Sequence, residues 1–167
     1  MQVSTEHHYT FGNSGNTQEW FIINDGVMGG LSKGQLTFTD STTVFAGTVS
    51  LDNNGGFTAY RSPYGQYDLS AYSTVTIRAR GQGQVIGFSL QMEQPYYAPY
   101  FRSTFVPQED WREYSFDLTD MPALRLGRNL GYTMSKADLA EVIRLGFITT
   151  EKAAGPFVLE IESVRFS

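Results

Sequence analysis

The chain of 167 residues contains no cysteine and only two histidines. Without cysteine, disulfides, thiolate metal sites and a thiol nucleophile are excluded, and the packed core must stabilise the fold unaided. The histidines, His7 and His8, are neighbours in a polar N-terminal segment. They offer no base for a Ser-His-Asp triad and too few ligands for a closed zinc site. We therefore expect neither hydrolase nor zinc chemistry.

Positive charge and long hydrophobic runs are also scarce. Lys and Arg total 12 against 17 Asp and Glu, which gives a formal net charge of −5. The basic residues are scattered, so a basic face that binds nucleic acid is not expected. No run is long enough for a membrane span, and residues 1–8 are polar without the apolar stretch of a secretory signal.

Apolar and polar residues alternate from about residue 35 onward, which is typical of antiparallel strands with one wet face. The predicted strands are residues 36–39, 45–51, 74–80, 86–92, 101–106, 114–118, 143–148 and 157–166. The apolar phase changes within the last of these, and a β-bulge near Glu162 and Ser163 would reconcile the two halves. Only residues 135–142 favour a helix, begun by a capping box of Ser135 and Asp138.

No linker, repeat or low-complexity tract divides the chain, and its prolines lie at strand boundaries. We expect one domain over residues 1–167, with a flexible N-terminus of about 15 residues. The predicted fold is all-β, a two-sheet antiparallel jelly-roll sandwich with at most one short helix.

Two glycine-rich segments, residues 24–30 and 52–57, stand beside strand-like sequence. Neither ends in the Lys-Ser/Thr of a phosphate-binding loop, and the second lacks the closing glutamate of a calcium loop. A structural turn and a ligand-binding loop both explain them. Their polar side chains, Asp25, Asn53 and Asn54, are candidate binding residues.

Aromatic residues supply a second group of candidates. Tyr96, Tyr97 and Tyr100 share a proline-stiffened loop and could stack on sugars, anchor a protein, or fold back over the core. Trp111 is either a binding platform or a tryptophan at the edge of the core.

Arg61 has the strand parity of Phe57 and Ala59, so its guanidinium shares a face with apolar side chains. A charge there requires a carboxylate or several carbonyls as partners. Arg61 would then organise the glycine segments or receive an anionic group from a ligand.

Hard-cation binding is the remaining chemistry to weigh. Terminal strands of sugar-binding sandwiches are often clamped by calcium, and Glu162 at the expected bulge is the candidate ligand. An outward-facing charge on an edge strand is the alternative explanation. Apart from such a structural calcium, no cofactor is expected, and no catalytic residue can be assigned.

Residues 20–30, 53–57 and Arg61-Ser62, in that order and spacing, resemble the complex I intermediate-associated protein 30 family, and the Asp-Gly-Val-Met-Gly-Gly string is its most specific part. The similarity continues through residues 67–72, Trp111, 126–128, 143–148 and 155–161. The resemblance implies a galactose-binding-domain-like sandwich related to carbohydrate-binding modules. For mitochondrial members, it implies a role in assembling respiratory complex I.

Two departures accompany the resemblance. No mitochondrial transit sequence is present, so we expect a cytoplasmic bacterial protein. Glu162 stands where such proteins more usually have Asp, which weakens the case for terminal-strand calcium.

Three functions follow, in order of preference. The first is a non-enzymatic, assembly or chaperone-like module that binds protein subunits through Asp25, Met28, Asn54, Arg61 and the Tyr96–Tyr100 loop. The second is a carbohydrate-binding domain that recognises a glycan by aromatic stacking. The third is an enzyme that acts on a small polar ligand between the glycine segments.

Overall fold

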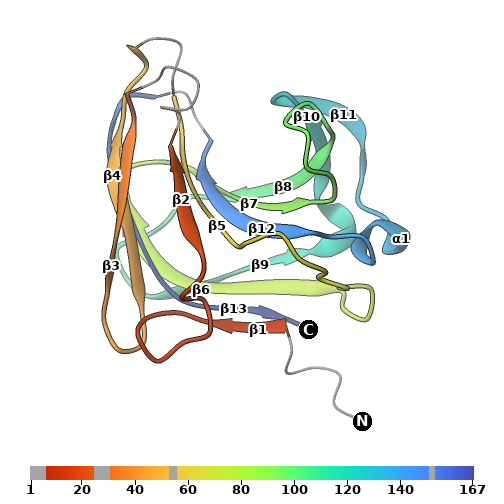
Figure 1. Ribbon diagram of the computed structural model, residues 1–167, viewed down its shortest axis with the longest axis horizontal. Coiled ribbons are helices and arrows are strands. Elements are labelled where there is room, and N and C mark those ends of the chain that lie inside the picture. The colour runs from red at the N-terminus through yellow and green to blue at the C-terminus, as the bar shows by residue number, and fades with distance from the viewer. Residues whose placement is uncertain (1–6, 25–30, 53–55, 151–152) are drawn as a thin grey trace.

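The computed structural model describes residues 7–24, 31–52, 56–150 and 153–167, and nearly all regular structure in them is β. Its strands form two antiparallel sheets packed face to face, as the sequence predicts for a jelly-roll sandwich (Figure 1). No helix in these residues has the length and apolar character needed to cross a membrane.

The six-stranded sheet has the order β3-β4-β13-β6-β9, with β1 paired to β13. Its strands are β1 (His8–Thr10), β3 (Lys33–Phe38), β4 (Thr43–Val49), β6 (Thr74–Gln82), β9 (Arg112–Asp117) and β13 (Gly155–Phe166). The longest strand, β13, pairs with β4 on one side and β6 on the other, so it holds the centre of the sheet.

The seven-stranded sheet has the order β11-β10-β8-β7-β12-β5-β2. Its strands are β2 (Phe21–Asn24), β5 (Thr58–Arg61), β7 (Ile86–Gln91), β8 (Tyr100–Phe105), β10 (Pro122–Arg125), β11 (Arg128–Thr133) and β12 (Arg144–Thr149). Figure 1 shows this sheet curling, so that β2 and the β10–β11 hairpin rise on either side of β12 and β7. Its outer face is therefore concave.

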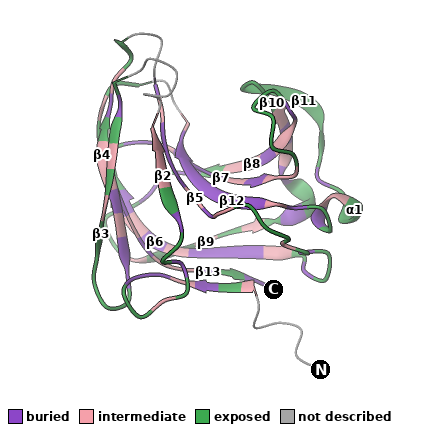
Figure 2. Cartoon of the chain, in the orientation of Figure 1, coloured by how far each residue is buried: buried purple, intermediate pink, exposed green. Residues whose placement is uncertain are grey.

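Aromatic side chains fill the space between the sheets, where Figure 2 shows the buried residues. Tyr60 of β5 is fully buried and contacts Phe45 of β4, with ring centroids 5.8 Å apart. Trp20 and Phe11 pack edge to face at 5.3 Å, and Trp20 also lies 5.6 Å from Tyr60. This large apolar burial stabilises a fold without disulfides.

Two local features of the sequence prediction, the bulge and the capping box, are confirmed, and two others differ in the structure. The register between β13 and β6 shifts between Ile161 and Ser163, which is the expected bulge at Glu162. The helix α1 (Lys136–Leu139) begins with the capping box of Ser135 and Asp138 but is shorter than expected. Residues 8–11, placed in a flexible N-terminus by the sequence, include β1 and bury Tyr9 and Phe11.

Candidate functional site

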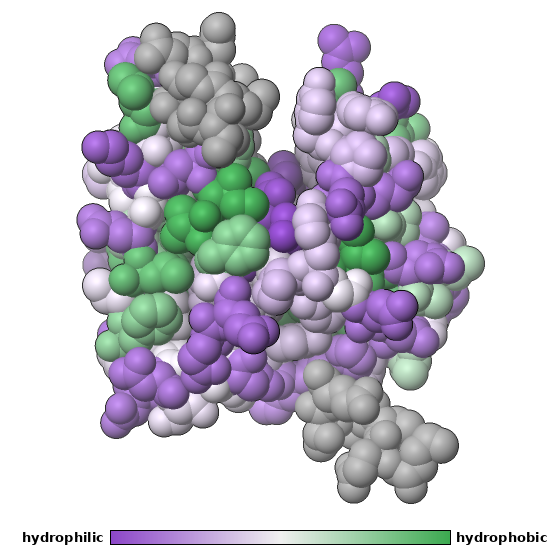
Figure 3. Space-filling model, in the orientation of Figure 1, coloured by the Kyte–Doolittle hydropathy of each residue, from purple (hydrophilic) through white to green (hydrophobic). Residues whose placement is uncertain are grey.

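The concave outer face of the seven-stranded sheet is the floor of a cleft of about 490 Å³. Five strands contribute lining residues: β2, β5, β12, β7 and β8. Pro95 and Tyr96 of the tyrosine-rich loop and the β10–β11 turn complete the lining. Figure 3 shows this hollow between two walls, with hydrophobic residues gathered over β2 and strongly hydrophilic ones at the bottom.

Strand register brings arginines from separate strands onto this floor. Arg61 of β5 lies opposite Gly146 of β12, which lies opposite Ser89 of β7. Ser89 in turn lies opposite Arg102 of β8. Because residues in register share a face of the sheet, Arg61 and Arg102 lie on the same side. Arg144 begins β12 two residues before Gly146 and so has the same orientation.

Two glycines on the floor make room for these arginines. A Cβ at Gly146 would lie 2.7 Å from Cγ of Arg61. A Cβ at Gly87 would lie 2.6 Å from Cδ of Arg102. The arginine stems therefore lie along the sheet, over positions where any larger residue would displace them.

Arg102 and Arg144 are held by neutral groups and aromatic rings. Nε of Arg102 donates to Oγ of Ser89 at 2.8 Å, and its guanidinium lies 4.6 Å above the ring of Tyr100. Arg144 is 7% exposed, and its Nε donates to the carbonyl oxygen of Ser62 at 2.8 Å. Its guanidinium lies 3.6 Å from the centroid of Tyr64. These contacts fix the direction of each guanidinium without neutralising its charge.

None of the three floor arginines has a carboxylate partner in the described part of the chain, where the ion pairs involve Arg78, Arg80 and Arg112 instead. The guanidinium of Arg61 makes no hydrogen bond within these residues either. Burial, followed by the charges of Arg144 and Arg102, lowers the pKa of Arg61 to about 10. The described residues therefore include neither the carboxylate nor the carbonyl partners that the sequence predicts for Arg61, and the glycine-rich segments that it would organise lie largely outside them.

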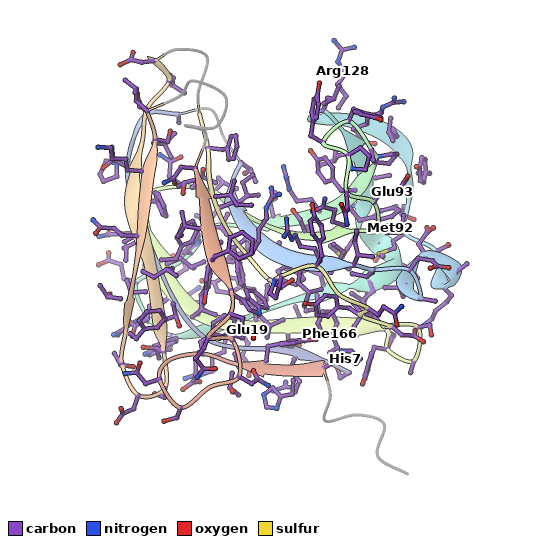
Figure 4. The ribbon with its side chains drawn as sticks, in the orientation of Figure 1. His7, Glu19, Met92, Glu93, Arg128 and Phe166 are labelled. Carbon is purple, nitrogen blue, oxygen red and sulfur yellow. The ribbon has the colours of Figure 1, made fainter. Side chains whose placement is uncertain are left out.

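Burial also lowers the pKa of Arg102 and of Arg144, and in both cases neighbouring tyrosines oppose the shift. The described lining residues include no Asp or Glu. Figure 4 shows Glu93 and Arg128 on the β7–β8 and β10–β11 side of the molecule, and neither lines the cleft. The floor is thus a local concentration of positive charge in a chain of net charge −5.

The walls of the cleft are apolar and aromatic. Ile23 and Phe57 line one side, while Tyr96 and Leu126 line the other. Tyr96 is 78% exposed and Leu126 61% exposed, so both offer apolar surface. Leu126 has a φ of 51°, in the left-handed region, within the short β10–β11 turn. The turn thus presents an apolar side chain at the rim of the cleft.

The structure places three of the sequence-predicted site residues together, since Arg61, Tyr96 and Tyr100 all line the cleft. Tyr97 lies next to them, with its carbonyl oxygen accepting from Nε of Arg125 at 3.0 Å, and its side chain is exposed. Tyr96 and Tyr97 therefore do not fold back over the core. The other predicted binding residues of the glycine-rich segments lie outside the described residues, namely Asp25, Met28, Asn53 and Asn54.

Trp111 and Glu162 lie elsewhere, on the outer face of the six-stranded sheet. The guanidinium of Arg80 is 4.9 Å from the ring centroid of Trp111. Oε1 of Glu162 pairs with Nε of Arg78 at 2.8 Å. The described residues contain no group of three or more His, Asp or Glu side chains that could hold a metal ion.

Sequence reasoning missed Arg102 and Arg144 as site residues. Arg144 was detectable in principle, because it is the single charge in the apolar stretch 143–148. Arg102 follows the tyrosine-rich loop and carries no such signal. The pairing of β5, β12, β7 and β8 brings both arginines beside Arg61. These strands are distant in the sequence, so no local pattern reveals the grouping.

Comparisons with known proteins agree with this architecture. The family model described as complex I intermediate-associated protein 30 matches residues 9–161. Comparison with curated proteins by sequence gives no match.

Several solved structures share the fold. The family 11 carbohydrate-binding module of a Clostridium thermocellum cellulosomal cellulase has a TM-score of 0.68 at 11% identity, over 95% of this chain and 93% of that one. A family 11 module from the same organism, in complex with a β-1,3-1,4-mixed-linked tetrasaccharide, gives 0.65 at 13% identity, over 95% of both chains. A family 29 carbohydrate-binding module gives 0.53 at 8% identity, over 95% of this chain and 87% of that one. At such identities the likeness establishes the jelly-roll sandwich and nothing about ligands.

Proposed function

Because the chain belongs to the complex I intermediate-associated protein 30 family, we propose that it is a non-enzymatic module that binds a segment of a protein subunit, as an assembly or chaperone-like factor. The binding site is the cleft between β2 and the β10–β11 hairpin. The observation that carries this proposal is the cleft itself, a concave site with exposed apolar walls and a charged floor. Such a combination suits an interface whose apolar contacts give affinity and whose polar contacts give orientation.

The chemistry of the lining supports binding more than catalysis. The described lining residues offer arginine, serine, glutamine, threonine and tyrosine, without histidine or a carboxylate. Oγ of Ser89 accepts from Arg102 and has no base beside it to activate it as a nucleophile. General acid-base catalysis most often uses histidine or a carboxylate, and the described lining residues include neither.

A glycan is the second candidate ligand. One solved structure with this fold is a carbohydrate-binding module in complex with a tetrasaccharide. In the present chain, Tyr96 and Tyr100 line the cleft and have the amphipathic rings on which sugars stack. This candidate makes a different prediction, since binding would then require no protein partner.

Site-specific photo-crosslinking tests the protein-binding proposal. A benzophenone amino acid is placed at Tyr96 or Leu126, on the rim of the cleft, or at Glu113 on the opposite sheet as a matched exposed control. After irradiation in the source organism, crosslinked proteins are identified by mass spectrometry. We expect the same protein at both rim positions and its absence at position 113.

Equal crosslinking at all three positions would contradict the assignment of the cleft. A glycan array and calorimetry with the mixed-linked tetrasaccharide test the second candidate in parallel. Saturable binding of a glycan, weakened by substitution of Tyr96 and without crosslinked protein, would replace the first proposal by the second.

A further inference from the structure

We propose that Arg61, Arg102 and Arg144 form a carboxylate-binding floor, and that the cleft receives an acidic polypeptide segment whose carboxylates are flanked by apolar side chains. This inference rests on the proposed function and names the chemistry of the partner. It is drawn from the charges, hydrogen bonds and ring contacts of the cleft.

No carboxylate among the described residues balances the charge of the floor. Elsewhere in the described chain, each ion-paired arginine has its carboxylate at 2.8 to 3.1 Å. The three floor arginines have none among the described residues, although acidic residues outnumber basic ones in the sequence. Gathering like charges in a partly buried site costs free energy, which a bound anion would offset.

Donors remain available on all three guanidinium groups. Arg102 and Arg144 each use Nε for a neutral oxygen, and Arg102 also has a side-chain hydrogen bond with Tyr100, which leaves further N–H groups on each guanidinium for a ligand. Arg61 donates no side-chain hydrogen bond there. A guanidinium presents parallel N–H groups that match the two oxygens of a carboxylate. The aliphatic parts of these arginines are held in place and their guanidinium groups keep N–H donors for a ligand. The floor is therefore a preorganised anion site.

Guanidinium groups already contact three aromatic rings beside the floor arginines, which favours a polypeptide over a neutral glycan. Arg102 lies over the ring of Tyr100, and Arg144 lies over the rings of Tyr64 and Phe21. A pyranose would have to displace a guanidinium to stack on these ring faces. A neutral sugar would also leave the positive charges unbalanced.

Apolar surface flanks the charged floor. Ile23 and Phe57 line one wall, and Leu126 lines the other. A segment that places carboxylates on the arginines can bury apolar side chains against these walls. In an extended segment successive side chains point to opposite faces, so acidic and apolar residues are expected at alternating or neighbouring positions.

Peptide selection with an amide comparison tests this inference. Random short peptides displayed on phage are selected against the full chain, and binders are resynthesised with each Asp or Glu replaced by Asn or Gln. Fluorescence anisotropy then measures Kd. We expect binders to combine acidic and apolar residues, and removal of a carboxylate or the Arg61→Met substitution to weaken binding roughly tenfold or more. The Arg80→Met control, on the opposite sheet, should leave Kd unchanged.

A double-mutant cycle sharpens the test, because Arg61→Met should cost the amide peptide much less than it costs the acidic one. Circular dichroism verifies the fold of each variant, and Arg102→Met replaces Arg61→Met if the latter does not fold. Equal affinity for acidic and amide peptides would overturn the inference, as would binding of galacturonate oligosaccharides but not peptides. If cleft crosslinking succeeds while carboxylates prove irrelevant, the protein-binding proposal stands and only the acidic partner falls.

Discussion

On the outer face of the six-stranded sheet, Arg78 and Arg80 each pair with a glutamate at 2.8 Å and lie near the ring of Trp111. On the outer face of the seven-stranded sheet, Arg61 and its neighbouring arginines have no carboxylate partner in the described chain. On the first face, glutamates of the protein itself therefore balance the charges of both arginines. The second face retains uncompensated charge inside a cleft, which is the condition expected of a surface that awaits a ligand.

One glycine from each sheet, Gly81 and Gly146, shows a related difference. On the six-stranded sheet, a Cβ at Gly81 would lie 2.1 Å from the carbonyl oxygen of Val158, part of the backbone of the neighbouring strand. On the seven-stranded sheet, a Cβ at Gly146 would first meet Cγ of Arg61. The glycine of the first sheet permits strand pairing, whereas the glycine of the second permits an arginine to lie flat.

The largest expected effect tests this difference between glycines. We expect Gly81→Ala to lower the free energy of unfolding by roughly 2–3 kcal/mol, because the β6–β13 backbone must shift. Gly146→Ala should cost less stability, because the Arg61 side chain can move, although Tyr60 O at 3.1 Å adds some strain. Urea denaturation of both variants provides the measurement.

The two variants should have the opposite order of effect on peptide binding, with Gly146→Ala weakening it more than Gly81→Ala. Gly146→Ala displaces Arg61 and should weaken the selected acidic peptides, whereas folded Gly81→Ala should bind them normally. If Gly146→Ala proved the more destabilising of the two, the distinction between the sheets would fail.

A second, smaller effect concerns the paired arginines. Glu160 accepts from Nε of Arg80 at 2.8 Å and from Oγ1 of Thr42 at 2.7 Å, and its side chain is only 16% exposed. We expect Glu160→Gln to lower the free energy of unfolding by about 1 kcal/mol. The matched Glu162→Gln variant, whose side chain is 42% exposed, should change it by less than about 0.5 kcal/mol because water screens that pair. Thermal unfolding at several salt concentrations compares the two, and equal losses would contradict the role assigned to burial.

Much of the fold could be predicted from the sequence, because apolar and polar residues alternate along a half-buried strand. The alternation of Val75, Ile77 and Ala79 marks β6, and the change of phase beside Glu162 marks the bulge in β13. The β10–β11 hairpin was missed because every residue of β11 is exposed and no apolar face appears in its sequence.

The site was only half predictable for a related reason. Arg61 was identified by parity with its own neighbours, a local property. Its grouping with Arg102 and Arg144 depends on the register of strands distant in sequence, which no local pattern encodes. Trp111 and Glu162 were candidates by residue type, but the fold places them beside arginines on the opposite sheet.

The smallest predicted effect is the change in the free energy of unfolding caused by Arg61→Met, and its sign distinguishes the two faces. Burial and the charges of Arg144 and Arg102 disfavour the charged form of Arg61 and lower its pKa to about 10. Because the folded pKa lies below the unfolded one, this penalty is fully present below about pH 10 and is relieved only as the pH rises through that value. At neutral pH, Arg61→Met should therefore leave stability unchanged or raise the free energy of unfolding by up to about 1 kcal/mol, even as it weakens peptide binding.

Arg61→Lys, which keeps the charge, is the matched control and should give no gain. Added salt should reduce any gain of the Met variant by screening the repulsion among the arginines. A loss of more than about 1 kcal/mol in Arg61→Met would mean that Arg61 stabilises the fold as Arg80 does. The two outer faces would then be alike, and the charged floor would be a structural feature instead of a site kept for a partner.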